Sequence, residues 1–258
     1  MPIAVAAAKA GKHVICEKPI ALNAGEARQM LDAVREGNVR HMVAFNYRRV
    51  PAIALARQMI QEGKIGRVFH FNAVYYQDWL VDPDFPYVWR HDKRAGGFGA
   101  HGDMNAHTVD LARFLVGEIE AVCGAEEVFI KERRLPAGDG KGIVTADDAL
   151  YFLARFRDGA LGTFMATRFA SGRKNYLRLE IFGSEGSLMF NLAVSLLRNP
   201  AVLLAAMALV CYIGLEWTMN NWTKPLMVEV FQSHGSENAA RNAGLVLALF
   251  GLAMGIRP

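Results

Sequence analysis

The chain has 258 residues, of which 52% are hydrophobic and 21% are charged. This composition predicts a globular protein of one or two domains and excludes a disordered or collagen-like chain. The 29 basic and 25 acidic residues are dispersed without a long block of one sign, so the formal net charge of +4 predicts no nucleic-acid partner. The three cysteines, Cys16, Cys123 and Cys211, stand far apart, which excludes a multi-disulfide scaffold and favours the reducing cytoplasm.

Helical and extended patterns alternate at short spacing in the first fifty residues. We expect a helix over 2–10 and a short buried strand over 13–19. A second helix begins at Asn23, with Glu26 three residues later as a variant of the capping box, and a strand over 41–45 follows it. This order predicts a parallel α/β unit, because neighbouring parallel strands need helical crossovers between them.

The pattern changes after a helix expected over 51–63. Five further strands are expected, one of them after another helix, at 66–78, 118–130, 149–156, 160–169 and 177–183. The dipeptide Asp158-Gly159 predicts a hairpin with a type I′ turn, because both residues accept positive φ angles. The middle of the chain is therefore predicted to be α+β, with an open, mostly antiparallel sheet and helices on one face.

Charged residues become sparse from about residue 193. The uncharged runs 201–215 and 242–256 predict an apolar helical tail over 193–258. Neither run reaches the roughly 18 to 20 apolar residues that a membrane-spanning helix needs. Two interpretations stay open, namely membrane association of this tail and a pair of buried helices in a soluble protein.

The first motif that carries chemistry is Glu17-Lys18-Pro19, at the carboxyl end of the strand expected over 13–19. Ligands of open α/β sheets generally bind at this edge, and a lysine there can reach a small molecule. A lysine after a strand is also common as a solvated loop cation, so the tripeptide alone leaves both interpretations open.

The second motif is the glycine-rich segment GGFGAHGDMNAHTVDLARFLVG, residues 96–117. A helix from Asp103 onward places Asp103 and His107 four residues apart on one face, where a carboxylate and an imidazole form an acid–base pair. The alternative is a capped helix in which His107 is only packed. A metal site of His101, Asp103 and His107 is disfavoured, because these three residues do not share one helix face.

The motifs together resemble the glucose-fructose oxidoreductase / inositol dehydrogenase family, called Gfo/Idh/MocA, over residues 2–192. The resemblance is carried by PIAVAAAKAGKHVICEKP, VAFNYRRVPA, EGKIGRV, VWRHDKRAGGFGAHGDMNAHTVDLARFLVG and LEIFGSEGSL. It implies part of a Rossmann domain over 1–47 that holds NAD or NADP, and a substrate domain over 48–192 whose sheet forms a homo-oligomer contact. The segment YYQDWLVDPDFPYVWR is similar to members that act on pyranose sugars and anhydrosugars, so the resemblance implies a sugar or cyclic polyol substrate.

The resemblance also implies roles for single residues. Lys18 touches the nicotinamide ribose and the reacting hydroxyl, Asp103 orients the lysine and the substrate, and His107 is the general base. The residues implied to line the cofactor are Glu17, Lys18, Asn46, Trp89 and Arg90. Arg48 and Tyr76 are further candidates for the pocket, and no metal is implied.

The chain also departs from the family pattern. Family members begin with a strand and a GxGxxG-type turn, and no such turn precedes the EKP motif here. We therefore expect an N-terminally truncated member, shorter by roughly 70 residues and impaired in activity. The tail over 194–258 resembles a fragment of a major facilitator transporter. Two other functions stay open, a non-catalytic oligomerising remnant and a membrane-associated transport fragment.

Overall fold

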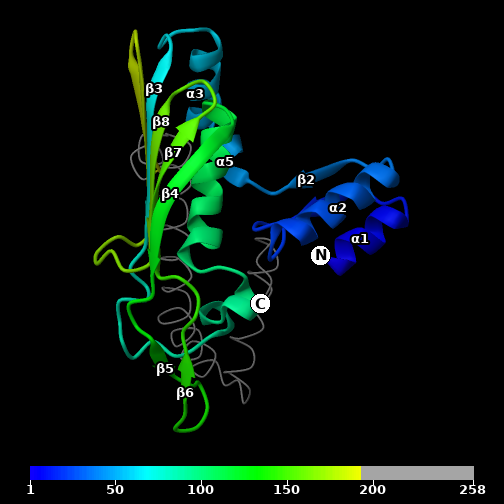
Figure 1. Cartoon of the computed structure of the whole chain (residues 1–258), viewed down its shortest axis with the longest axis vertical. Coiled ribbons are helices and arrows are strands. Elements are labelled where there is room, and N and C mark those ends of the chain that lie inside the picture. The colour runs from blue at the N-terminus through cyan, green and yellow to red at the C-terminus, as the bar shows by residue number, and fades with distance from the viewer. Residues whose placement is uncertain (193–258) are drawn as a thin grey trace, which may run out of the picture. The chain divides into compact units, whose positions relative to one another are not determined.

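The computed structural model describes residues 1–192 (Figure 1). In chain order its elements are α1 (Pro2–Lys9), β1 (Val14–Cys16), α2 (Ala24–Glu36), β2 (His41–Val43), the 3-10 helix η1 (Asn46–Arg49), α3 (Pro51–Gln61), β3 (Val68–Tyr76), the 3-10 helix η2 (Trp89–His91), α4 (Lys93–Gly96), the π-helical turn η3 (His101–Asn105), α5 (Ala106–Leu115), β4 (Ile119–Glu127), β5 (Glu132–Arg134), β6 (Lys141–Ile143), β7 (Ala149–Phe156), β8 (Leu161–Thr167), β9 (Tyr176–Gly183) and β10 (Ser187–Asn191).

The N-terminal elements form the predicted parallel α/β unit. Strand β1 pairs with β2 in parallel, and α1 packs with α2 around a small cluster of buried aliphatic side chains. The Asn23 side chain accepts a hydrogen bond from the Glu26 backbone N–H at 2.9 Å, so the predicted cap of α2 is confirmed. The expectation of a buried strand is wrong for one face of β1, because the Ile15 side chain is 73% exposed on the face that the helices do not cover.

The larger part of the described chain is a six-stranded sheet in the order β10-β9-β3-β8-β7-β4. Within this sheet β3 and β8 are parallel and the other neighbours are antiparallel, which confirms the prediction of a mostly antiparallel sheet. Alternate residues of β3, namely Phe71, Ala73 and Tyr75, are buried on the face that α3 and α5 cover (Figure 1). In residues 1–192 no helix covers the opposite face.

The hairpin predicted at Asp158-Gly159 joins β7 to β8, but the predicted turn type is wrong. Gly159 has a φ of 87°, whereas Asp158 is not among the residues with positive φ. The Gly159 N–H donates to the Phe156 carbonyl at 2.9 Å, and the Phe156 N–H donates to the Ala160 carbonyl at 2.9 Å. This pattern is a type I turn followed by a left-handed glycine, and it needs positive φ at only one residue.

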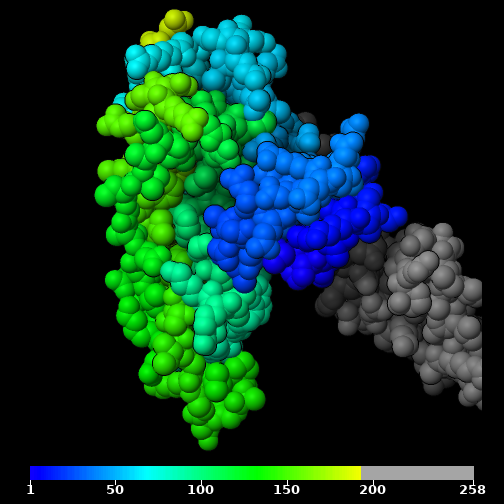
Figure 2. All heavy atoms as spheres, turned by 45° about the vertical axis from the view of Figure 1, so that its right-hand side comes forward, coloured from blue at the N-terminus to red at the C-terminus, as the bar shows by residue number. Residues whose placement is uncertain are grey.

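The apolar tail predicted over 193–258, with its membrane association, lies outside the described residues. Among residues 1–192 no helix is long and apolar enough to cross a lipid bilayer. The N-terminal residues lie against the mid-chain residues on the side of the sheet that carries α3 and α5 (Figures 1 and 2). This placement brings the EKP motif to the glycine-rich segment.

Candidate active site

The lysine of the EKP motif contacts the aspartate of the glycine-rich segment. Strand β1 ends at Cys16, two residues before Lys18, and the Lys18 Nζ lies 2.7 Å from the Asp103 Oδ1. The same ammonium donates a second hydrogen bond to the Asp103 carbonyl at 3.0 Å. The two residues are 85 positions apart in the sequence, so this contact closes the space between the two motifs.

Asp103 lies in a π-helical turn and not in the first turn of an α-helix as expected. The helical segment begins at His101, and the α-helical part begins only at Ala106. The turn is fixed from outside by Asp147, whose buried carboxylate accepts the N–H groups of Gly99 and His101, each at 2.7 Å. A Cβ atom on Gly99 would lie 1.7 Å from the Asp147 carbonyl oxygen, so only glycine permits this approach. π-helical turns are frequent at functional sites.

A second cation, Arg168, holds the other oxygen of the Asp103 carboxylate. Its Nη2 lies 3.3 Å from the Asp103 Oδ2 and donates to the Gly99 carbonyl at 3.0 Å, and the residue is only 2% exposed. Burial alone would raise the pKa of Asp103, but the hydrogen bonds and charges of Lys18 and Arg168 hold that pKa below its usual range. Asp103 is therefore a carboxylate at neutral pH.

His107 lies one helical turn after Asp103, in the first turn of α5, and is 7% exposed. Its ring packs edge-on against Tyr47 and Phe45, with ring centroids 4.7 and 6.0 Å apart. Burial, helped by the charge of Lys18 and opposed by Asp103, lowers the pKa of His107 to about 4. The imidazole is thus neutral at neutral pH and able to accept a proton.

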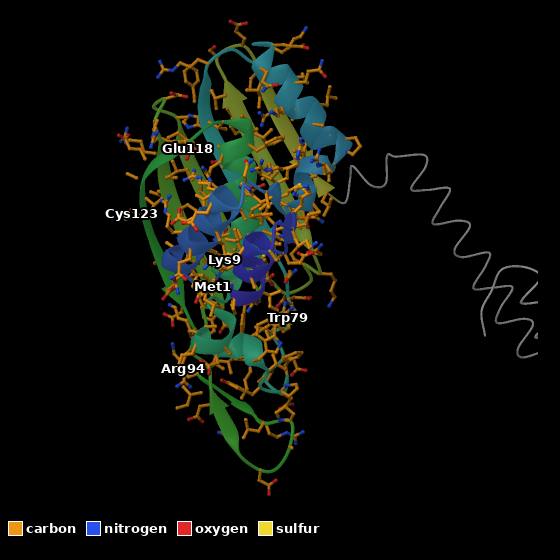
Figure 3. All side chains as sticks on the ribbon, turned by 90° about the vertical axis from the view of Figure 1, so that its right-hand side faces the viewer. Met1, Lys9, Trp79, Arg94, Glu118 and Cys123 are labelled. Carbon is orange, nitrogen blue, oxygen red and sulfur yellow. The ribbon has the colours of Figure 1, made fainter. Side chains whose placement is uncertain are left out.

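Neutral polar side chains line the sheet beside this charged cluster. The hydroxyl groups of Tyr47 and Tyr75 lie 2.9 Å apart, and burial is the main cause that raises the pKa of Tyr75. Further along, Trp79 Nε1 donates to the Gln77 amide oxygen at 2.9 Å, and the Gln77 amide donates to Asn175 at 3.0 Å. In the view of Figure 3, Trp79 lies between α1 and the β5–β6 hairpin.

The two further candidates for the pocket, Arg48 and Tyr76, contact other partners. The Tyr76 hydroxyl donates to the Met165 sulfur at 3.3 Å on the uncovered face of the sheet, because successive residues of a strand point to opposite faces. Arg48 is held by Asp110 of α5, with 2.8 Å between Nε and Oδ2. The sequence motifs did not single out Arg168, Asp147, Tyr47, Tyr75 or Trp79. For Arg168 and Tyr75 the strand alternation gives a signal, since both extend a row of buried side chains.

The predicted cofactor-lining residues lie at the strand ends and on η2. Glu17 and Asn46 are exposed and follow the carboxyl ends of the adjacent parallel strands β1 and β2. Trp89 is 61% exposed, with the Arg90 guanidinium 5.1 Å from its ring. Burial lowers the pKa of Arg168, and the charge of Arg90 adds to this effect, so Arg90 acts electrostatically on the cluster. In the described part of the chain no three His, Cys, Asp or Glu side chains are arranged to hold a metal ion.

Comparison with known families identifies the chain. Residues 1–45 match the model of an oxidoreductase family with an NAD-binding Rossmann fold, and residues 53–189 match the model of the GFO/IDH/MocA C-terminal domain. The chain belongs to the Gfo/Idh/MocA family. The family prediction made from the motifs is therefore confirmed. The resemblance of the tail to a transporter has no support from these comparisons.

Several relatives of known sequence or structure are similar to this family member. Levoglucosan dehydrogenase of Pseudarthrobacter phenanthrenivorans is 49% identical over 201 residues, which are 73% of this chain and 52% of the relative. Myo-inositol 2-dehydrogenase of Thermotoga maritima is 32% identical over 187 residues, 72% of this chain and 51% of the relative. A levoglucosan dehydrogenase solved with NADH and L-sorbose is 50% identical with a TM-score of 0.73, covering 75% of this chain and 51% of that one. The chain thus spans about half the length of the curated relatives it matches.

Proposed function

We propose that this chain carries the reaction centre of an NAD-dependent dehydrogenase that oxidises a hydroxyl group of a sugar or cyclic polyol. The observation that carries the proposal is the direct contact of Lys18 with Asp103 beside the buried, neutral imidazole of His107. The names of the relatives, a levoglucosan dehydrogenase and inositol dehydrogenases, support this substrate class.

The residues at the strand ends fit the nicotinamide part of the cofactor. Glu17, Lys18 and Asn46 follow the carboxyl ends of two adjacent parallel strands, where ligands of open α/β sheets bind. The exposed indole of Trp89 and the guanidinium of Arg90 offer a flat, cationic surface suited to a dinucleotide. NAD, when bound there, would accept a hydride from the carbinol carbon. We propose NAD because solved relatives hold NADH, and NADP is an outcome of the test below.

The three central residues divide the work on the substrate hydroxyl. His107 takes the hydroxyl proton while the carbon–hydrogen bond breaks and the carbonyl bond forms. The Lys18 ammonium donates a hydrogen bond to the reacting oxygen and stabilises its developing negative charge. Asp103 holds Lys18 in place and balances its charge. Proton and hydride thus leave the substrate to different acceptors, and the product is a ketone.

The test is a fluorescence titration of the full chain with NADH and NADPH, followed by turnover with levoglucosan and myo-inositol. We expect saturable binding of NADH, weaker binding by Lys18→Met, and unchanged binding but lost turnover in His107→Phe. Lys131→Met, a lysine exposed near the end of β4, is the matched control. Binding of neither dinucleotide would overturn the proposal. The impaired activity expected from the sequence stays a prediction, and the turnover assay measures it.

We also propose two domains, residues 1–47 and 48–192, with self-association through the uncovered face of the sheet. The aliphatic cluster under α1 and α2 is separate from the core under the large sheet, which supports the division.

Self-association is proposed from exposed apolar side chains on the uncovered face of the large sheet. Leu153 and Met189 are 61% and 69% exposed on this face, where a second copy of the chain would bury them. The same exposed face favours the second candidate, a non-catalytic oligomer. Light scattering decides: Leu153→Glu should give monomers, and an oligomer without cofactor binding would favour the second candidate.

A further inference from the structure

The Asp103 carboxylate lies between two cations that differ in mobility. Lys18 approaches one oxygen from the loop after β1, on a flexible stem that is 20% exposed. Arg168 approaches the other oxygen from the end of β8 and is almost completely buried. The roles proposed above for Lys18, Asp103 and His107 explain the first contact but not the second.

We propose that Arg168 is a positioning residue that keeps Asp103 ionised and in place when Lys18 turns from the carboxylate to the reacting oxygen. This inference rests on the proposed function for the movement of Lys18. It assigns to Arg168 a role in the reaction centre without contact to substrate or cofactor.

Arg168 is held too firmly to follow Lys18. Its backbone N–H donates to the Asp148 carbonyl at 3.0 Å, and its carbonyl accepts the Leu80 N–H at 3.3 Å. Its Nη2 donates to the Gly99 carbonyl, and the guanidinium lies 5.3 Å from the centre of the Trp79 ring. A guanidinium stays protonated throughout the physiological range, so this positive charge is permanent.

The Lys18 side chain, unlike that of Arg168, is free to change its hydrogen-bond partners. An ammonium has three donors on a flexible stem, and two of them are used on Asp103. When Lys18 donates to a substrate oxygen, the carboxylate loses part of its compensation in a site where burial favours the neutral acid. With Arg168 in place one counter-ion remains, so Asp103 stays a carboxylate. Lys18 can then return to its ion pair with Asp103 after the reaction.

The competing explanation is that Arg168 only braces the turn at Gly99. The pKa of Asp103 distinguishes this explanation from the proposed one. If Arg168 only supports the turn at Gly99, then replacing it in a chain that still folds should leave the Asp103 pKa unchanged. The charged or titratable groups that face Asp103 come from four places: Lys18 after β1, Tyr75 of β3, His107 of α5 and Arg168 after β8.

The experiment is a carbon NMR titration of the full chain labelled at the aspartate carboxyl carbons, with the Asp103 signal assigned by Asp103→Asn. In Lys18→Met, Arg168 is the remaining counter-ion, and we expect the Asp103 carboxyl to become a weaker acid by less than about tenfold relative to the wild-type chain. In Lys18→Met combined with Arg168→Met we expect at least about a tenfold further weakening of the acid, one pH unit. Lys18→Met combined with Arg168→Lys should restore a value near that of the single variant.

Two results would overturn the inference. The first is a weakening of the Asp103 acid by more than about tenfold in Lys18→Met, a measurement that needs no change at Arg168 and so survives any folding defect of its variants. The second is the same Asp103 pKa with and without Arg168. A chain that fails to bind NADH but titrates as expected would remove the proposed function and leave the pairing of Arg168 with Asp103 intact.

Discussion

The buried imidazole of His107 makes the stability of the protein depend on pH. Its pKa is lowered from 6.5 to about 4 in the folded chain, first by burial and then by the charge of Lys18. In the unfolded chain the imidazole returns to about 6.5. Between these two values the unfolded state binds more protons than the folded state. The stabilisation is therefore complete above pH 6.5 and is lost as the pH falls toward 4.

The size of this effect follows from the two pKa values. A difference of about 2.5 pH units is worth about 3 kcal/mol when the whole window is crossed. Between pH 7 and pH 5 the loss for this one residue is about 2 kcal/mol. His107 is only 7% exposed, so solvent screens the effect little.

The assay is urea unfolding of the wild-type chain and of His107→Phe at several pH values between 5 and 7. Circular dichroism monitors the unfolding and gives the free energy of unfolding at each pH. Phenylalanine keeps an aromatic ring between Phe45 and Tyr47 but cannot titrate. We expect the stability difference between the two proteins to shift by about 2 kcal/mol in favour of the variant at pH 5. His70→Gln, a change at an exposed imidazole outside the site, is the control for the loss of a histidine. A difference that is constant over this range would refute the account of His107.

Three further predictions concern stability and use the same unfolding assay. Asp147→Ala leaves the N–H groups of Gly99 and His101 without their acceptor, and we expect the free energy of unfolding to fall by about 3 kcal/mol. The control Asp139→Ala, at an exposed aspartate, should lower it by less than about 0.5 kcal/mol. Asn23→Ala removes the cap of α2 and should cost about 1 kcal/mol, so an unchanged midpoint would contradict the capping contact. Phe164→Ala, at a fully buried ring in the sheet core, should cost about 3 to 5 kcal/mol, and a smaller loss would mean that the core collapses around the cavity.

The family resemblance implied the convergence of the two motifs, and general features of sheets and helices are consistent with it. A residue after a parallel strand lies at the carboxyl edge of the sheet, which places Lys18 where ligands bind. A glycine-rich segment before a helix lets another backbone approach, which the contact of Gly99 with Asp147 shows. The spacing did not indicate the π-helical turn, because the carboxylate that accepts the N–H groups of Gly99 and His101 belongs to Asp147, 46 to 48 positions away.

The residues that were missed depend on which face of a strand a side chain occupies. Phe164, Ala166 and Arg168 alternate along β8 and beyond it, and the first two are core residues. A charged residue in the third place of such a row must be buried and needs a partner. The same alternation separates Tyr75 from Tyr76. The turn at Gly159 shows the opposite limit, since Asp-Gly suits a type I′ turn and also a type I turn with a following glycine.

The charges around Asp103 explain why the imidazole is the proton acceptor in the proposed reaction. Asp103 forms ion pairs with Lys18 and Arg168, and its lowered pKa makes it a poor base. Tyr75 is buried, its pKa is raised, and it therefore keeps its proton. Lys18 is a cation in contact with a carboxylate and has no lone pair to offer. His107 alone among these four groups is neutral with a free ring nitrogen, and the adjacent positive charge lets it release the proton again after each turnover.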